Sequence, residues 1–156
     1  MDMIEQDRIG QLNLNVGIEL LKISKNKKSA CIFCHIKEHN NYNDLFSVLC
    51  YKHQFMELRD INVDFYDDRN TDLKEIYNQY DFIIHITGKR FQKKTDIHFF
   101  VKNEKEVIVE YSVCETFTWE MEFVLSESFD CRMYNYIDDA PHKWHKEIKP
   151  EYKHLL

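Results

Sequence analysis

Histidine, carboxylate and lysine side chains gather near the end of this 156-residue chain, in the segment YIDDAPHKWHKE and just after it. An imidazole titrates near neutral pH, so His142, His145 and His154 could supply a general base and a general acid. Asp139 could fix the tautomer of the base by accepting a hydrogen bond from its second ring nitrogen. These four residues are the predicted catalytic set.

Lysines interleave with the histidines, and Lys143, Lys146 and Lys153 could bind a phosphate group. A base for the 2′-hydroxyl, an acid for the leaving 5′-oxygen and positive charge for the phosphorane are what a metal-independent ribonuclease needs. We expect Pro141 to begin a short helix over residues 142–147, which would bring these side chains together. The same residues also fit a metal site or a solvated, charged tail.

A second constellation consists of Cys31, Cys34, Cys50 and His53, whose spacing is that of two zinc-ligand pairs. The apolar run SACIFCHI is nevertheless typical of a buried strand, and cysteine is often simply packed in a core. We therefore predict buried free thiols, no bound metal and no cofactor, with a zinc-stabilised binding domain as an alternative. The motif HITGK is interpreted as a strand that ends in a glycine turn.

The elements that would position these residues differ between the two halves of the chain. In the first half, short apolar runs alternate with helical patterns, which predicts strands at 29–36, 62–68 and 82–87 and helices at 43–58 and 71–80. A strand–helix–strand–helix–strand order is typical of a βαβαβ-type unit with parallel pairing.

In the second half, apolar and polar residues alternate with a period of two at 96–101, 107–113 and 117–125, and a fourth strand is expected at 131–137. Short connections between these strands indicate an antiparallel sheet of four strands. The predicted fold is α+β, a single domain in which an α/β part (1–88) packs with the antiparallel sheet and the C-terminal motif (89–156).

Composition narrows the class of protein. With 11 Phe, 9 Tyr and 2 Trp the chain can bury a core, and its formal net charge of −6 disfavours general affinity for nucleic acids. Five cysteines without a secretory or transmembrane pattern predict a cytoplasmic protein with reduced thiols and no membrane contact.

The run EYSVCETFTWEMEFVLSESFDCRMYNYIDDAPHKWHKEIKPEYKH resembles the C-terminal part of TumE-family toxins from bacterial toxin–antitoxin modules. That family tends to show a strand with Glu-Tyr, an aromatic strand with Trp, a motif like Arg-Tyr-Asp-Asn-Ala-Pro-His-His and a histidine-rich ending. Here Asp139 stands where Asn is usual, and Lys143 stands where a second His is common. The corresponding residues are Tyr136, Asp138, Asp139, Ala140, Pro141, His142, His145, Lys153 and His154.

The resemblance implies a small intracellular toxin or defence protein that acts on RNA and is neutralised by a protein antitoxin carrying a helix-turn-helix. A second hypothesis is a non-catalytic interaction or inhibitor protein that presents its acidic segments, such as DRNTD and EMEF, to a partner.

Overall fold

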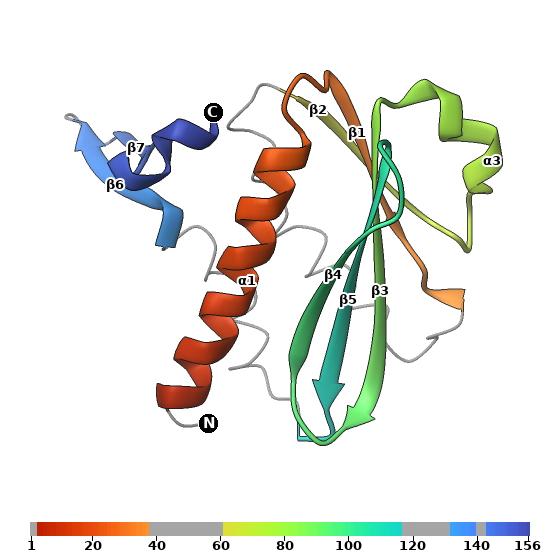
Figure 1. Ribbon diagram of the computed structural model, residues 1–156, viewed down its shortest axis with the longest axis horizontal. Coiled ribbons are helices and arrows are strands. Elements are labelled where there is room, and N and C mark those ends of the chain that lie inside the picture. The colour runs from red at the N-terminus through yellow and green to blue at the C-terminus, as the bar shows by residue number, and fades with distance from the viewer. Residues whose placement is uncertain (1–2, 38–60, 117–131, 140–142) are drawn as a thin grey trace.

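The structure is a computed structural model that describes residues 3–37, 61–116, 132–139 and 143–156. The long helix α1 (Met3–Ile23) lies against one face of a five-stranded sheet, and the short helix α3 (Leu73–Ile76) lies on the other side (Figure 1). A two-stranded hairpin and a C-terminal 3-10 helix lie on the side of α1 that faces away from the sheet (Figure 1).

The main sheet has the strand order β2-β1-β3-β5-β4. Strands β2, β1, β3 and β5 run parallel to one another, and the edge strand β4 pairs antiparallel with β5. The strands are β1 (Ser29–Cys34), β2 (Asn62–Asp67), β3 (Phe82–Gln92), β4 (Asp96–Val101) and β5 (Glu106–Cys114).

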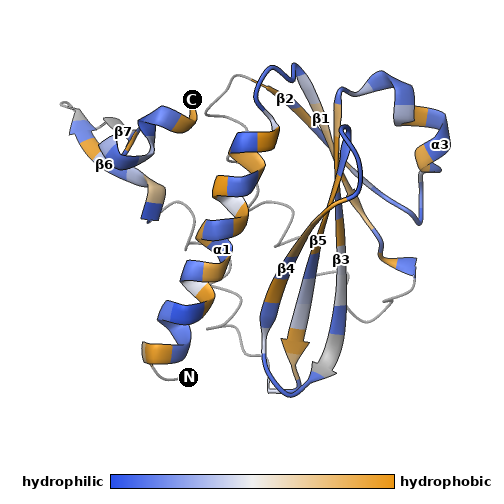
Figure 2. Cartoon of the chain, viewed as in Figure 1, coloured by the Kyte–Doolittle hydropathy of each residue, from blue (hydrophilic) through white to orange (hydrophobic). Residues whose placement is uncertain are grey.

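The face of the sheet under α1 carries the main hydrophobic core. Alternate residues of each strand point to this face, so Ile32, Ile84 and Val109 pack together with no exposed surface. From α1, Ile9, Leu20 and Leu21 complete the cluster, and Figure 2 shows the resulting mixture of apolar and polar residues along the helix.

The opposite face holds a smaller cluster and is more polar. Cys31 and Ile83 pack there against Tyr80, which follows α3 and the 3-10 helix η3 (Tyr77–Gln79). Asp72 caps α3, because its side chain accepts a hydrogen bond from the backbone N–H of Lys74. This face also carries the polar residues described in the next section.

The C-terminal part packs on α1 as a separate hairpin, β6 (Tyr134–Asp139) with β7 (Lys143–Ile148), followed by the 3-10 helix η4 (Pro150–Leu155). Tyr134, Ile148 and Leu155 belong to the main hydrophobic cluster. Arg132 donates to the side chain of Asp7 at 2.9 Å and so links the start of the hairpin to α1.

The α+β class is confirmed, with several differences from the predicted arrangement. The strands expected at 29–36, 62–68, 82–87, 96–101 and 107–113 are present, and a short α3–η3 segment occupies the helix expected at 71–80. Strands β4 and β5 do pair antiparallel, but they extend the parallel strands within one mixed sheet and do not form a second sheet with β6.

Three further expectations concern individual elements. Residues 142–147 do not form a helix in the part that the structure describes, because Lys143–Ile148 is strand β7, paired with β6. The expected helix at 43–58 and the expected strand at 117–125 lie outside the described residues. No described helix is long and apolar enough to cross a membrane.

Candidate acid–base site

Two histidines and a glutamate form a hydrogen-bonded chain on the α3 side of the sheet. The Nε2 atom of His35 lies 2.9 Å from Nδ1 of His85, and Nε2 of His85 lies 2.8 Å from Oε1 of Glu106. The planes of the two imidazole rings are nearly parallel, at an angle of 20°, and their centroids are 5.1 Å apart. Phe33 contacts both rings edge-on, so their orientation is held by packing as well as by hydrogen bonds.

Three neighbouring strands position these side chains. His35 directly follows β1, and its backbone N–H continues the β1–β3 ladder by donating to the carbonyl of Ile86 at 2.9 Å. His85 lies within β3 opposite Phe33, and Glu106 begins β5 opposite Ile83. The parallel register therefore brings His35, just after β1, to the same face as His85 of β3 and Glu106 of β5.

Glu106 is buried, with 4% of its surface exposed, yet its hydrogen bonds favour the carboxylate form. Burial raises the pKa of Glu106, but hydrogen bonds from Asn103 and His85, together with nearby positive charge on Lys102, outweigh it and lower the pKa overall. Asn103 donates to Oε2 at 2.7 Å and Tyr77 donates to the same oxygen at 3.3 Å.

His85 is the neutral residue between His35 and Glu106 in this series of hydrogen bonds. Burial lowers the pKa of His85 and outweighs the opposing effect of its hydrogen bond to Glu106. An ionised Glu106 can only accept, so Nε2 of His85 carries the proton and Nδ1 of His85 is an acceptor. His35 must then donate through Nε2, and in the neutral form of its ring the lone pair is on Nδ1.

A cavity of about 540 Å³ lies beside His35, where the chain leaves β1 and β2. Its lining includes Phe33, His35 and Leu73, with Lys37 and the carboxylates of Asp68, Asp72 and Glu75 among the charged groups. Asp68 also accepts hydrogen bonds from the backbone N–H groups of Ile36 and Lys37 at 2.8 and 2.9 Å, which fixes the turn after β1. Ligands commonly bind outside the carboxyl ends of parallel strands, and this cavity is at such a place.

The arrangement has the parts of an acid–base catalyst. His35 lines the cavity, His85 sets its tautomer, and the buried carboxylate of Glu106 sets the tautomer of His85 in turn. A histidine oriented by a second hydrogen-bonding group is the usual form of a general base. Among the described residues, no group of three or more metal-ligating side chains converges on one point.

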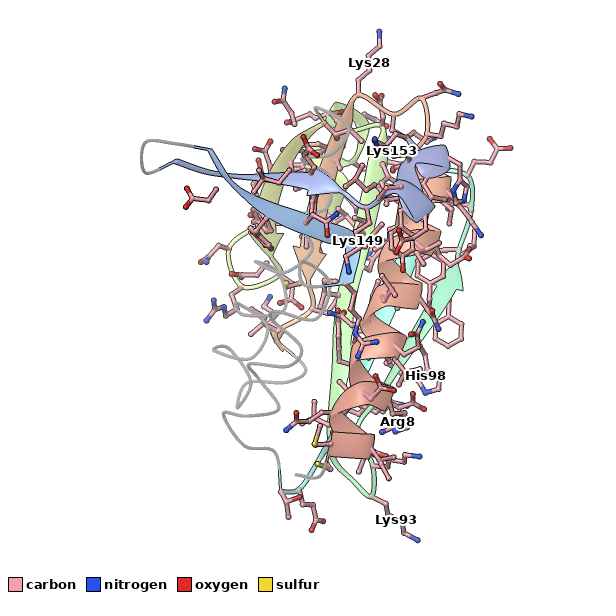
Figure 3. All side chains as sticks on the ribbon, turned by 90° about the vertical axis from the view of Figure 1, so that its left-hand side faces the viewer. Arg8, Lys28, Lys93, His98, Lys149 and Lys153 are labelled. Atoms are coloured by element: carbon pink, nitrogen blue, oxygen red, sulfur yellow. The ribbon has the colours of Figure 1, made fainter. Side chains whose placement is uncertain are left out.

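The catalytic residues predicted from the sequence lie on and around the C-terminal hairpin. The β6–β7 register pairs Asp139 with Lys143, Tyr136 with Lys146, and Ile137 with His145. His142 and Pro141 lie outside the described residues. Lys153 and His154 are exposed on η4, and Figure 3 shows Lys153 and Lys149 near the hairpin.

The structure separates the two described cysteines of the proposed zinc set. Cys31 points to the α3 face and belongs to the smaller cluster, whereas Cys34 belongs to the cluster under α1. The two sulfurs lie on opposite faces of the sheet, as the period of a strand requires for positions three apart, so they do not share one ion. Cys50 and His53 lie outside the described residues.

The cysteines differ in chemical state. Cys31 is a buried free thiol, as predicted, and burial raises its pKa to about 12. Cys34 is disulfide-bonded, so the prediction of a free thiol there is wrong. The sequence could not reveal this bond, because a strand pattern does not show which cysteines pair. A disulfide also removes the free-thiol argument for a reducing compartment.

His35, His85 and Glu106 were not among the predicted site residues, because the runs SACIFCHI and HITGK were interpreted separately. One signal was present: each histidine lies in or just after an expected strand of a parallel unit, and such strand ends meet at one edge of the sheet. Glu106 gave no such signal, because its position depends on the parallel pairing of β5 with β3.

Comparison of the chain with protein-family models, with curated proteins and with solved structures gives no match.

Proposed function

We propose that this protein is an enzyme that moves protons with His35, in the cavity at the carboxyl ends of β1 and β2. One observation carries the proposal: a continuous chain of hydrogen bonds runs from the cavity-lining His35 through His85 to the buried Glu106. A buried carboxylate costs stability unless it is hydrogen-bonded, and here its hydrogen bonds fix the tautomer of a residue that reaches a cavity.

The proposed step begins with neutral His35. Its Nδ1 atom takes a proton from water or from a substrate hydroxyl or amide, and the resulting imidazolium keeps its Nε2–H···Nδ1 bond to His85. The same proton then passes from Nδ1 to the leaving atom, so His35 acts first as base and then as acid. Carboxylates outnumber lysine and arginine in the cavity lining, so a small uncharged or cationic substrate fits better than a polyanion.

The proposal can be tested with chromogenic esters, amides and phosphodiesters as probes of hydrolysis. His35→Ala should lower hydrolysis of a responsive probe by about a hundredfold or more, the usual contribution of a general base. The matched control is His98→Ala, because His98 is exposed on β4 and does not belong to the hydrogen-bonded series of His35, His85 and Glu106. Equal rates for wild type and His35→Ala on every probe would refute the proposal.

A second candidate function is the metal-independent ribonuclease of a TumE-like toxin, acting through His142, His145, His154 and Asp139. The observation that favours it is the register of the hairpin, which pairs Asp139 with Lys143, the described residues on either side of His142 in the sequence. Lys143, Lys146 and Lys153 would bind the RNA phosphates, and a helix-turn-helix antitoxin would neutralise the protein in the cytoplasm.

Induced expression in a bacterial host distinguishes the two candidates. A toxin should arrest growth, His142→Ala should relieve the arrest, and His35→Ala should leave it unchanged. Relief by His35→Ala alone favours the cavity site. An absence of both growth arrest and probe hydrolysis favours the non-catalytic interaction protein.

A further inference from the structure

Among the strands that the structure describes, β4 forms one edge of the main sheet and carries apolar side chains that reach solvent. Phe100 is 50% exposed and Val101 is 61% exposed, and the His98 ring stacks on Phe100 with centroids 6.2 Å apart. Figure 3 shows His98 projecting away from the body of the molecule. A sheet edge of this kind presents unpaired backbone groups that can pair with another strand.

The hydrogen bonds of β4 show which backbone groups face outward. The N–H of Lys102 donates to the carbonyl of Glu106 at 3.0 Å, so in the alternating antiparallel pattern the even-numbered residues bond to β5. The N–H and C=O groups of Ile97, Phe99 and Val101 therefore point to the free edge. Arg8 agrees with this assignment, because its guanidinium donates to the carbonyl of Thr95, the next odd-numbered residue.

We propose that β4 pairs antiparallel with β4 of a second copy of this chain, with the two-fold axis at Phe99. In this register Phe99 faces Phe99 of the second copy, and Ile97 faces Val101 of the second copy. Each of these pairs has its N–H and C=O groups pointing to the free edge, so each can exchange both backbone hydrogen bonds. The two five-stranded sheets would then form one continuous sheet.

Charge complementarity selects the second copy as the partner. The same register places Asp96 opposite Lys102 of the second copy, twice by symmetry, and His98 opposite Phe100 of the second copy. Moving the axis to Phe100 would place Asp96 opposite Glu104 of the second copy, which brings like charges together. Of these two registers, only the one centred on Phe99 brings opposite charges together.

In the single chain, Asp96 and Lys102 interact with described residues close to them. Asp96 accepts from the backbone N–H of Ile97 at 2.9 Å and lies 3.3 Å from the His98 ring. Lys102 lies 3.8 Å from Glu106, with 54% of its side chain exposed. Pairing would transfer the N–H of Ile97 to a backbone carbonyl of the second copy and free the Asp96 carboxylate to meet Lys102.

A charge exchange tests the partner and the register together. Sedimentation velocity should show reversible dimers of the full chain, and either Asp96→Lys or Lys102→Asp should weaken the self-association about tenfold or more, because two attractive pairs become repulsive. The double variant Asp96→Lys/Lys102→Asp should restore association to within about threefold of wild type. The control variants Glu151→Lys and Lys25→Asp make the same charge changes at exposed positions off the edge and should have no effect.

Amide hydrogen exchange locates the contact independently. Exchange at Phe99 and Val101 should slow as protein concentration rises, while exchange at His98 and Phe100 should not change. The proposal fails if the chain remains monomeric at about 1 mM, if the double variant does not recover, or if protection appears elsewhere. Unfolding temperatures of all variants establish that the edge, and not the fold, is altered.

Discussion

At the scale of single residues, the chain of His35, His85 and Glu106 couples a cavity to a buried charge. Glu106 is 4% exposed and His85 is 6% exposed, so both depend on each other for hydrogen bonding. The carboxylate fixes one tautomer of His85, and this tautomer decides which nitrogen of His35 bears a proton.

Glu106→Gln keeps the shape of the side chain and removes its charge, so it tests this coupling directly. The oxygen of the new amide can still accept a hydrogen bond from His85, but the neutral amide no longer stabilises positive charge on the two histidine rings. We expect hydrolysis of a responsive probe to fall by about ten- to a hundredfold, and the pKa of His85 to fall further. Nitrogen chemical shifts of the His85 ring, followed by NMR, report both its pKa and its tautomer.

A merely structural role for Glu106 would give a different result. In that case Glu106→Gln would lower the free energy of unfolding without changing the tautomer of His85 or the pH profile of hydrolysis. Asn103→Ala is a useful companion variant, because it removes a second hydrogen bond to Glu106 at 2.7 Å while leaving the carboxylate in place.

At the scale of elements, α1 holds the layers of the fold together. Its buried residues contact the sheet, while Asp7 and Gln11 interact with Arg132 ahead of the hairpin. The helix is followed by a turn in which Asn26 adopts a φ of 69°, the left-handed region that few residues tolerate. This turn allows β1 to run back along α1.

Leu20→Ala should destabilise the protein by about 2–5 kcal/mol, because it leaves a cavity at a position with no exposed surface. Ile4→Ala is the control on the same helix, since Ile4 is 83% exposed, and we expect a change within about 0.5 kcal/mol. Urea unfolding gives both free energies. Similar values for the two variants would mean that α1 does not pack on the sheet as described.

Asn26 offers a test of the turn itself. Asn26→Ala should lower the free energy of unfolding by about 1 kcal/mol, because a Cβ-bearing residue without a polar side chain is disfavoured at positive φ. Asn26→Gly should be neutral or stabilising at the same position. Thermal unfolding of the two variants should therefore rank Gly above Ala, and the reverse order would contradict the turn geometry.

The sequence predicted single strands well and their assembly poorly, for a physical reason. Alternation and apolar runs report which backbone segments are extended, so β1 to β5 were found. Strand order depends on contacts between distant residues: the pairing of β5 with β3 merges two expected sheets into one. Helix α1 was not among the predicted elements, although Ile9, Val16 and Leu20 recur at helical spacing and are buried.

Two residues of the candidate site could also have been predicted from the sequence. His35 and His85 follow from placing the carboxyl ends of two parallel strands side by side, whereas Glu106 requires the topology of the whole sheet. The catalytic set His142, His145, His154 and Asp139 stays a prediction.

At the scale of the whole molecule, the buried pair of His85 and Glu106 makes the free energy of unfolding depend on pH. The folded-state pKa of His85 lies below its ordinary value of 6.5, so below that pH the unfolded chain binds more protons than the folded chain. The folded-state pKa of Glu106 lies below its ordinary value of 4.5, so its contribution is complete above 4.5 and is lost as pH falls through the lowered pKa. Both effects destabilise the protein as the pH falls: that of His85 sets in first, and that of Glu106 follows at lower pH.

We therefore expect the free energy of unfolding to decrease from about pH 7 to about pH 5, with His85 contributing to the slope. His85→Gln cannot titrate, so the difference between wild type and variant isolates the His85 contribution from that of the other histidines. Urea unfolding at several pH values measures it. An unchanged slope in His85→Gln would show that His85 is protonated equally in the folded and unfolded states.

The strand order also has a consequence for the time course of folding. Strands β4 and β5 meet across a short turn, whereas His35 lies 50 residues from His85, and His85 lies 21 residues from Glu106. Closing the longer loop costs more chain entropy before any contact rewards it, so the pairing of β1 with β3 is expected to follow the β4–β5 hairpin. A nascent chain that has formed only the β4–β5 hairpin lacks the hydrogen bond between His35 and His85. The capacity for proton transfer therefore arises when the last strands join the sheet.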